Sequence, residues 1–133
     1  MRVVGVYFAT LVVFLGMDFV WLSSMLGRLY KPALGEFLAE KPNFPAAGVF
    51  YALYAVGIVA LAVMPAREVG VLRATWMGAL LGLVAYGTYD LTNMATLRNW
   101  STTLTVADMA WGTVATAVAA TVGCVVARSL IGR

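Results

Sequence analysis

The sequence predicts an all-α fold, a polytopic bundle of four transmembrane helices, from its composition and from the spacing of its charges. Of the 133 residues, 62% are hydrophobic and 11% are charged, whereas soluble domains carry roughly 25% charged residues. A soluble domain of this size could not cover its surface with so few charges. Four charge-poor stretches are each close to the ~20 residues that a helix needs to cross a bilayer. Open strands cannot satisfy their backbone in lipid, so these stretches are expected to be helices.

The predicted spans cover residues 3–26, 44–64, 74–97 and 104–127 and form one domain over residues 1–133. The second span has no charged residue, and the others are interrupted only by Asp18, Asp90 and Asp108 in turn. The first span is too long for the apolar part of a typical signal peptide and contains Asp18, so we expect it to be retained as a helix.

The loops between the spans differ in character. Pro32 suits a helix start, and residues 33–40 place Leu34, Phe37 and Leu38 on one face, which favours a short helix lying on the membrane interface. An ordinary polar loop is the alternative. The link over residues 98–100 is expected to be a tight turn.

Four spans place both termini on one side of the membrane, and the Lys and Arg counts on the two sides differ slightly. Five cations are expected on the side of the termini and four on the other: Arg2, Arg67, Arg73, Arg128 and Arg133, against Arg28, Lys31, Lys41 and Arg98. The positive-inside rule therefore favours cytoplasmic termini.

Two absences narrow the chemistry. The chain has no histidine, which excludes His-ligated haem, His-based zinc sites and Ser-His triads. The single cysteine, Cys124, lies in an apolar run and is expected to pack rather than react. We predict no cofactor and no metal site. The net charge of +3 is spread over loops and chain ends, so no nucleic-acid partner is expected.

Small residues recur every four positions in the third and fourth spans, and such faces let membrane helices approach closely. They are Gly78 and Gly82 in one span, and Gly112, Thr116 and Ala120 in the other, together with Ala115, Ala119 and Gly123. The main interpretation is packing within the monomer. A homodimer seam is the alternative.

The three intramembrane carboxylates are the most informative residues. An aspartate at a helix centre costs about 2.5–3.5 kcal/mol on insertion scales, so each is expected to face the bundle interior or a wet cavity. Asp90 lies nine residues before Asn99, Asp108 nine after it, and Asp18 nine before Gly27. All three are therefore expected in one layer, roughly 12 Å from the same membrane side. With cytoplasmic termini, that layer is in the extracytoplasmic half.

Polar and aromatic residues share helix faces with these acids, since positions three and four apart are neighbours. The pattern D-x-x-W occurs twice and D-x-x-N once, and Tyr51 and Tyr54 lie near the same side. The predicted ligand-binding set is Asp18, Trp21, Tyr86, Tyr89, Asp90, Asn93, Asp108 and Trp111. It would form an acidic cavity with aromatic walls.

Each acid also has a structural interpretation. Asp108 could cap its own helix, because Thr105-x-x-Asp108 resembles a capping box. Asp90 with Asn93 could join two helices. Asp18 could pair with Arg28 or Arg98 for stability.

Four fragments together resemble a known family: "GMDFVWLS", "KPNFPAAGVFYALYAVG", "YGTYDLTNMATLRNW" and "TVADMAWGTV". In the same order and over nearly the whole chain, they resemble the bacterial membrane proteins grouped as domain-of-unknown-function family 2177. The resemblance implies a four-helix bacterial membrane protein, and the expected location is therefore the bacterial inner membrane. It implies no activity.

Three functions remain open. The first is a site that binds or transports a small lipophilic or cationic ligand, with proton and ligand competing for the carboxylates. The second is a lipid- or isoprenoid-modifying membrane enzyme that uses Asp as acid, base or metal ligand. The third is a non-catalytic accessory subunit of a larger membrane complex. Beyond the lipid bilayer, the expected partners are such a ligand, a second copy or that complex.

Overall fold

A computed structural model describes residues 1–38, 41 and 43–132, and the described part contains no strand. Four helical segments are long and apolar enough to cross a membrane: Arg2–Leu34, Phe44–Ala66, Val71–Thr96 and Thr102–Leu130. Their main helices are α1 (Arg2–Met25), α3 (Phe44–Ile58), α5 (Val71–Thr96) and α6 (Thr102–Leu130). This confirms the predicted fold class, an all-α protein with four transmembrane helices.

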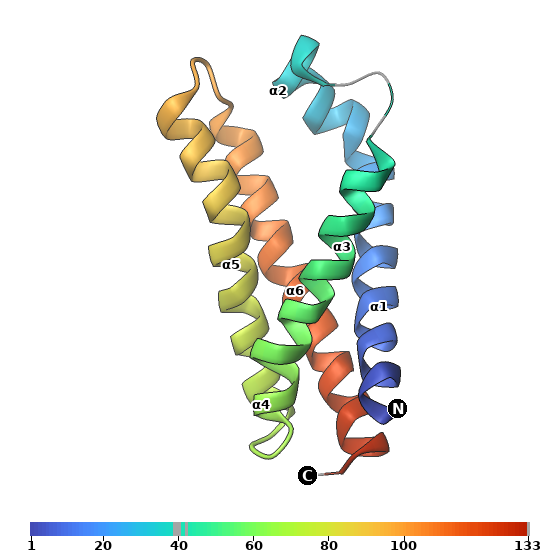
Figure 1. The fold of residues 1–133 in the computed structure, drawn as a ribbon. Coiled ribbons are helices and arrows are strands. Elements are labelled where there is room, and N and C mark those ends of the chain that lie inside the picture. The colour runs from blue at the N-terminus through green and yellow to red at the C-terminus, as the bar shows by residue number, and fades with distance from the viewer. Residues whose placement is uncertain (39–40, 42, 133) are drawn as a thin grey trace.

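The four long helices run alternately up and down, and both ends of the chain lie at the same end of the bundle (Figure 1). The opposite end carries α2 and the turn between α5 and α6. We call it the loop end. The strongest packing is between the antiparallel pair α5 and α6, and α1 packs mainly on α6.

The first helix does not stop where the sequence predicts. It continues from α1 through a π-helical turn, η1 (Leu26–Tyr30), and the short α2 (Lys31–Leu34) into a 3-10 turn, η2 (Gly35–Phe37). A short helix is therefore present in the first loop, but it begins before Ala33 and ends before Gly35. Residues 39 and 40, which complete the predicted interfacial segment, lie outside the described residues.

The helix of the second span begins with a side-chain N-cap. The Asn43 side chain accepts a hydrogen bond from the Ala46 amide, and Pro45 occupies the first turn, where its missing N–H costs nothing. The helix α3 continues through a π-helical turn, η3 (Val59–Val63), and α4 (Met64–Ala66).

The turn between α5 and α6 is tight, as predicted. Asn99 has a φ of 56°, a left-handed conformation that asparagine tolerates. Ser101 caps α6, because its hydroxyl accepts from the Leu104 amide at 3.0 Å. The predicted capping role of Asp108 is therefore wrong, since Asp108 is the seventh residue of α6 and lies beyond the amides that need a cap.

The small residues pack helices within one chain, as expected. A methyl group at Gly78 would meet Ala120 Cβ at 2.7 Å and the Thr116 carbonyl at 2.8 Å, so α5 and α6 are in close contact there. Cys124 is fully buried, and its thiol is free. Large apolar side chains cover the outside instead, among them Phe8, Phe19 and Leu53, which suits a surface that faces lipid.

Candidate functional site

All three intramembrane carboxylates are buried, as the sequence predicts: Asp18 on α1, Asp90 on α5 and Asp108 on α6. None is neutralised by a cation of the described residues, whose one ion pair joins Arg67 and Glu68 at 3.7 Å. The predicted pairing of Asp18 with Arg28 or Arg98 is therefore wrong. The acids obtain their partners from tyrosine and tryptophan instead.

Asp18 has a donor for each carboxyl oxygen. The Tyr51 hydroxyl on α3 donates to Oδ2, and Trp111 Nε1 on α6 donates to Oδ1 at 3.1 Å. This carboxylate thus joins three helices. A buried group with both oxygens satisfied contributes to the structure and has little need of a ligand.

Asp108 has a partner that the sequence analysis missed. The Tyr30 hydroxyl donates to its Oδ1 at 2.6 Å and accepts from Trp21 Nε1 at 2.8 Å. Tyr30 is the last residue of η1, beyond the predicted end of the first span. A tyrosine just past the end of that span was the only signal in the sequence, and it became informative once the helix was found to continue.

In the two D-x-x-W patterns, the tryptophan of each pattern is linked by hydrogen bonds to the aspartate of the other. Trp111 donates to Asp18, and Trp21 reaches Asp108 through the Tyr30 hydroxyl. The two indole rings also stack on each other. The residues that repeat in the sequence therefore form one network between α1 and α6.

Asp90 differs from the other two acids. It is 0% exposed, and neither of its carboxyl oxygens has a hydrogen-bond partner. The predicted interhelical link through Asn93 is therefore wrong. The neighbouring group is the Asp108 carboxyl across the α5–α6 interface. Two ionised carboxylates offer each other no donor, so satisfying Asp90 requires a proton or a cation.

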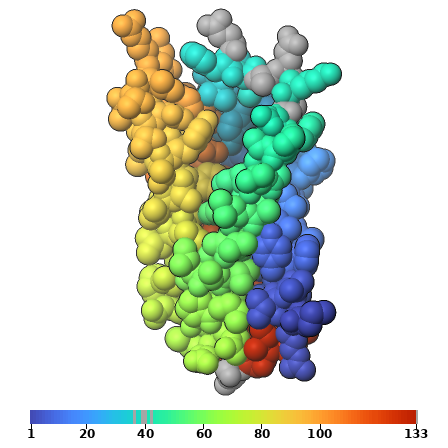
Figure 2. Space-filling view, viewed as in Figure 1, coloured from blue at the N-terminus to red at the C-terminus, as the bar shows by residue number. Residues whose placement is uncertain are grey.

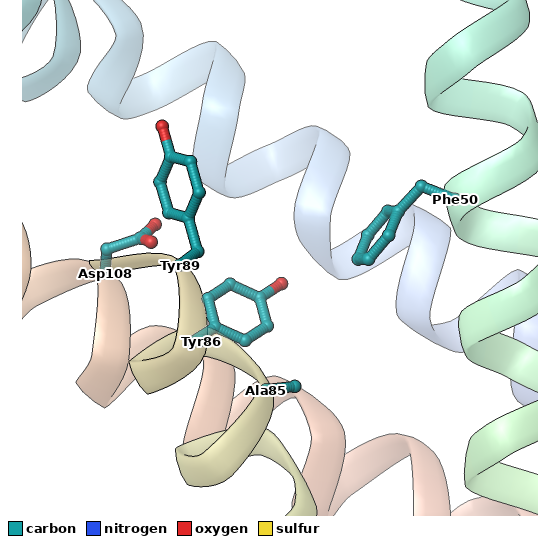
Figure 3. A pocket seen from close by; sticks show the side chains of 5 residues that line it. All are labelled: Phe50, Ala85, Tyr86, Tyr89 and Asp108. Atoms are coloured by element: carbon teal, nitrogen blue, oxygen red, sulfur yellow. The ribbon is translucent and has the colours of Figure 1, made fainter. Parts of the chain in front are cut away.

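A cavity of about 320 Å³ adjoins Asp108 of this acid pair. Figure 3 shows its wall, with an aromatic ring from α3 opposite the side chains from α5 and the carboxylate from α6: Phe50, Ala85, Tyr86, Tyr89 and Asp108. In the space-filling view, the surface is hollowed between α3 and α5 (Figure 2). The cavity is lined by apolar and aromatic groups with one acid, the composition of a small-molecule site.

The predicted ligand-binding set is therefore divided. Tyr86, Tyr89 and Asp108 line the cavity, whereas Asp90 does not line it but neighbours Asp108. The remaining members, Asp18, Trp21 and Trp111, form the adjoining network, and Asn93 is half-buried on α5.

Two wall residues were not predicted. Phe50 and Ala85 are ordinary apolar residues in the sequence, so nothing distinguishes them before the helices are placed. In the part of the chain that the structure describes, no three acids or cysteines are grouped closely enough to hold a metal ion.

The chain was compared with known proteins and families. No curated protein and no solved structure matches it. One family does, described as "Predicted membrane protein (DUF2177)", and its sequence profile matches residues 3–125. The match reaches all four membrane-spanning segments, ends within the fourth, and includes all three buried acids, so the chain belongs to the DUF2177 family of predicted membrane proteins.

Proposed function

We propose that this protein binds a small lipophilic cation in the cavity between α3 and α5, at Asp108 backed by Asp90. The observation that carries the proposal is the unsatisfied carboxyl of Asp90, fully buried beside a second acid. A buried polar group without a partner is costly, and a buried charge is more so. A positive charge in the cavity would offset that cost.

The walls suit an organic cation. Tyr86 and Tyr89 line the cavity on one side and Phe50 on the other, and aromatic faces attract cations within about 6 Å. Two carboxylates alone supply too few oxygen ligands for a divalent metal such as Ca²⁺, which prefers six or more. An ammonium group with an apolar substituent fits the composition better.

A proton would compete with that cation. Without a ligand, a proton held between Asp90 and Asp108 would give each carboxyl a partner. A monovalent cation could replace this proton without a change in the charge of the site. The proposal therefore includes exchange of a proton for the cation.

The test is a direct binding measurement on the purified protein in detergent, by calorimetry. The probe is benzyltrimethylammonium, and neopentylbenzene is its uncharged counterpart of the same shape. We expect the cation to bind and the hydrocarbon to bind at least about tenfold more weakly, a difference of about 1.4 kcal/mol.

Two variants identify the site. Asp90→Asn keeps the shape but removes the charge, and we expect it to weaken binding at least about tenfold while the protein remains folded. The matched control is Glu68→Gln, because this acid is exposed in a loop and far along the chain from the cavity. Equal binding by Asp90→Asn, or equal binding of the two probes, would overturn the proposal.

A non-catalytic accessory subunit is the second candidate, because Asp18 and Asp108 already have donors within the chain. Such a protein would use its acids only to hold helices together. It predicts that neither probe binds and that Asp90→Asn changes stability alone.

We further propose a place in the bacterial inner membrane with cytoplasmic termini. Both ends of the chain lie at one end of the bundle. The sequence assigns five cations to the side of the termini and four to the other side, which favours cytoplasmic termini. The cavity would then lie in the extracytoplasmic half of the membrane.

A further inference from the structure

We infer that the cation reaches the acid pair sideways from the bilayer, through an opening between α3 and α5, and therefore carries an apolar tail. This inference rests on the proposed function and names its ligand class, a membrane-partitioned amphiphilic amine. Two independent observations lead to it: Tyr30 is bonded to Asp108 on the side of the loop end, and two residues of the cavity wall, Phe50 and Tyr89, are exposed on the outer surface.

The closure toward the loop end comes from η1. Tyr30 lies in this turn, between α1 and the α2 segment at the loop end, and its hydroxyl is bonded to the Asp108 carboxyl. Trp21 Nε1 donates a hydrogen bond to the Tyr30 hydroxyl, and the Trp21 ring stacks on Trp111. A ligand that came from water at this end would have to displace Tyr30 and break two hydrogen bonds.

The opposite is true of the side between α3 and α5. Phe50 is 46% exposed and Tyr89 is 54% exposed, although both line the cavity. The helix α5 packs on α6 and on η3, which lies toward the end with the termini, while α3 packs on α1. Above η3, the two helices diverge toward the loop end and leave the hollow of Figure 2.

The depth of the opening decides what lies outside it. Tyr89 is seven residues before the end of α5 at Thr96, which is roughly 10 Å along the helix. Ala85 and Tyr86 lie deeper by about one more turn. With a hydrocarbon core of about 30 Å, the opening meets acyl chains rather than water. A ligand whose charged group sits at Asp108 would extend its tail into this hydrocarbon.

The experiment uses the full chain in phosphatidylcholine nanodiscs. The probe is benzyldimethyldodecylammonium with a photoreactive diazirine near the end of its alkyl chain. After irradiation, the labelled peptides are identified by mass spectrometry. We expect adducts on α3 and α5 that an excess of benzyltrimethylammonium suppresses, and that fall about tenfold in Asp90→Asn. Adducts on the exposed side of α1, around Phe8 and Phe19, measure labelling from the bulk lipid.

Each alternative result has one meaning. Adducts that concentrate at the loop end, around Arg28, Leu29 and Ser101, and that the untailed cation suppresses would overturn lateral entry but leave the proposed binding site standing. Adducts on α3 and α5 that neither Asp90→Asn nor the competitor reduces would represent labelling from the bulk lipid, like the adducts on α1. This result would overturn the inference. The calorimetric test decides separately whether the cation binds at all.

Discussion

The indole rings of Trp21 and Trp111 stack with their centroids 4.7 Å apart and their planes 5° from parallel. Each ring belongs to a D-x-x-W pattern, and each indole N–H points into a carboxylate network: Trp111 bonds Asp18 directly, and Trp21 bonds Tyr30, which bonds Asp108. The stack therefore holds the two acids of α1 and α6 in a fixed relation. It also forms part of the closure beside the cavity.

The stack predicts an energetic coupling between the two tryptophans. A double-mutant cycle with Trp21→Leu and Trp111→Leu should give a coupling of about 0.5–1.5 kcal/mol, the range for aromatic pairs. The measurement is reversible unfolding in mixed micelles. The matched pair is Trp21→Leu with Trp76→Leu, because Trp76 lies on α5 near the opposite end and is 49% exposed. Coupling of equal size in both cycles would contradict a specific stack.

Tyr30→Phe should lower stability and open the loop end. The change removes the hydroxyl that bonds Asp108 and Trp21 together, and such bonds in membrane helices contribute about 0.6 kcal/mol on average and up to 1.7 kcal/mol. Tyr7→Phe is the control, since its hydroxyl makes one exposed bond to the Ala52 carbonyl. We expect the Tyr30 variant to unfold more readily than the Tyr7 variant. The opposite order would show that the network adds nothing to stability.

Gly112→Ala should disrupt the packing of the Tyr86 ring against α6 and lower the stability of the protein. A methyl group at this position falls within the Tyr86 ring, so the ring must move into the cavity or α5 must move from α6. Overpacking of this kind costs about 1–3 kcal/mol. Gly16→Ala is the matched control, because nothing lies within 4 Å of its added methyl. Thermal unfolding of both variants checks the prediction, and equal stability would contradict the close packing.

The affinity for benzyltrimethylammonium should fall as the pH is lowered. A proton taken up at Asp90 removes negative charge from the site and weakens its attraction for the cation, so binding is weakened by up to about tenfold per pH unit for one displaced proton. The other titratable groups near the pair are Asp18 on α1, Tyr30 on η1, and Tyr86 and Tyr89 on α5. Calorimetry over a pH series checks this slope. Asp90→Asn should remove the slope, and a slope unchanged in that variant would assign the proton elsewhere.

Cysteine labelling should distinguish the two sides of the membrane. In a Cys124→Ala background, a membrane-impermeant maleimide applied to intact cells should label Asn99→Cys and leave Arg2→Cys unlabelled. Permeabilised cells provide the control, in which both positions should react. Labelling of Arg2→Cys alone from outside would reverse the proposed topology.

Much of the fold is readable from local sequence. A span of about 20 apolar residues must become a helix in lipid, whatever its neighbours are, because its backbone has no other partners. The four spans follow from this requirement, and the burial of Asp18, Asp90 and Asp108 follows from the cost of an ionisable side chain that faces lipid. The end of the first span could not be read in this way, since η1 and α2 continue past Gly27 through a polar segment that composition alone interprets as a loop.

The sequence by itself determined that this chain is a four-helix membrane protein and that three acids need partners inside it. Only the tertiary structure decided which acid is left without one. Partners between helices depend on how each helix is rotated and how closely it approaches the next, and these are set by small residues such as Gly112 on the packing faces. That geometry places the donors Tyr51 and Trp111 at Asp18. Asp90 lies beside Asp108 without a hydrogen-bond partner, because no donor of the described residues reaches it.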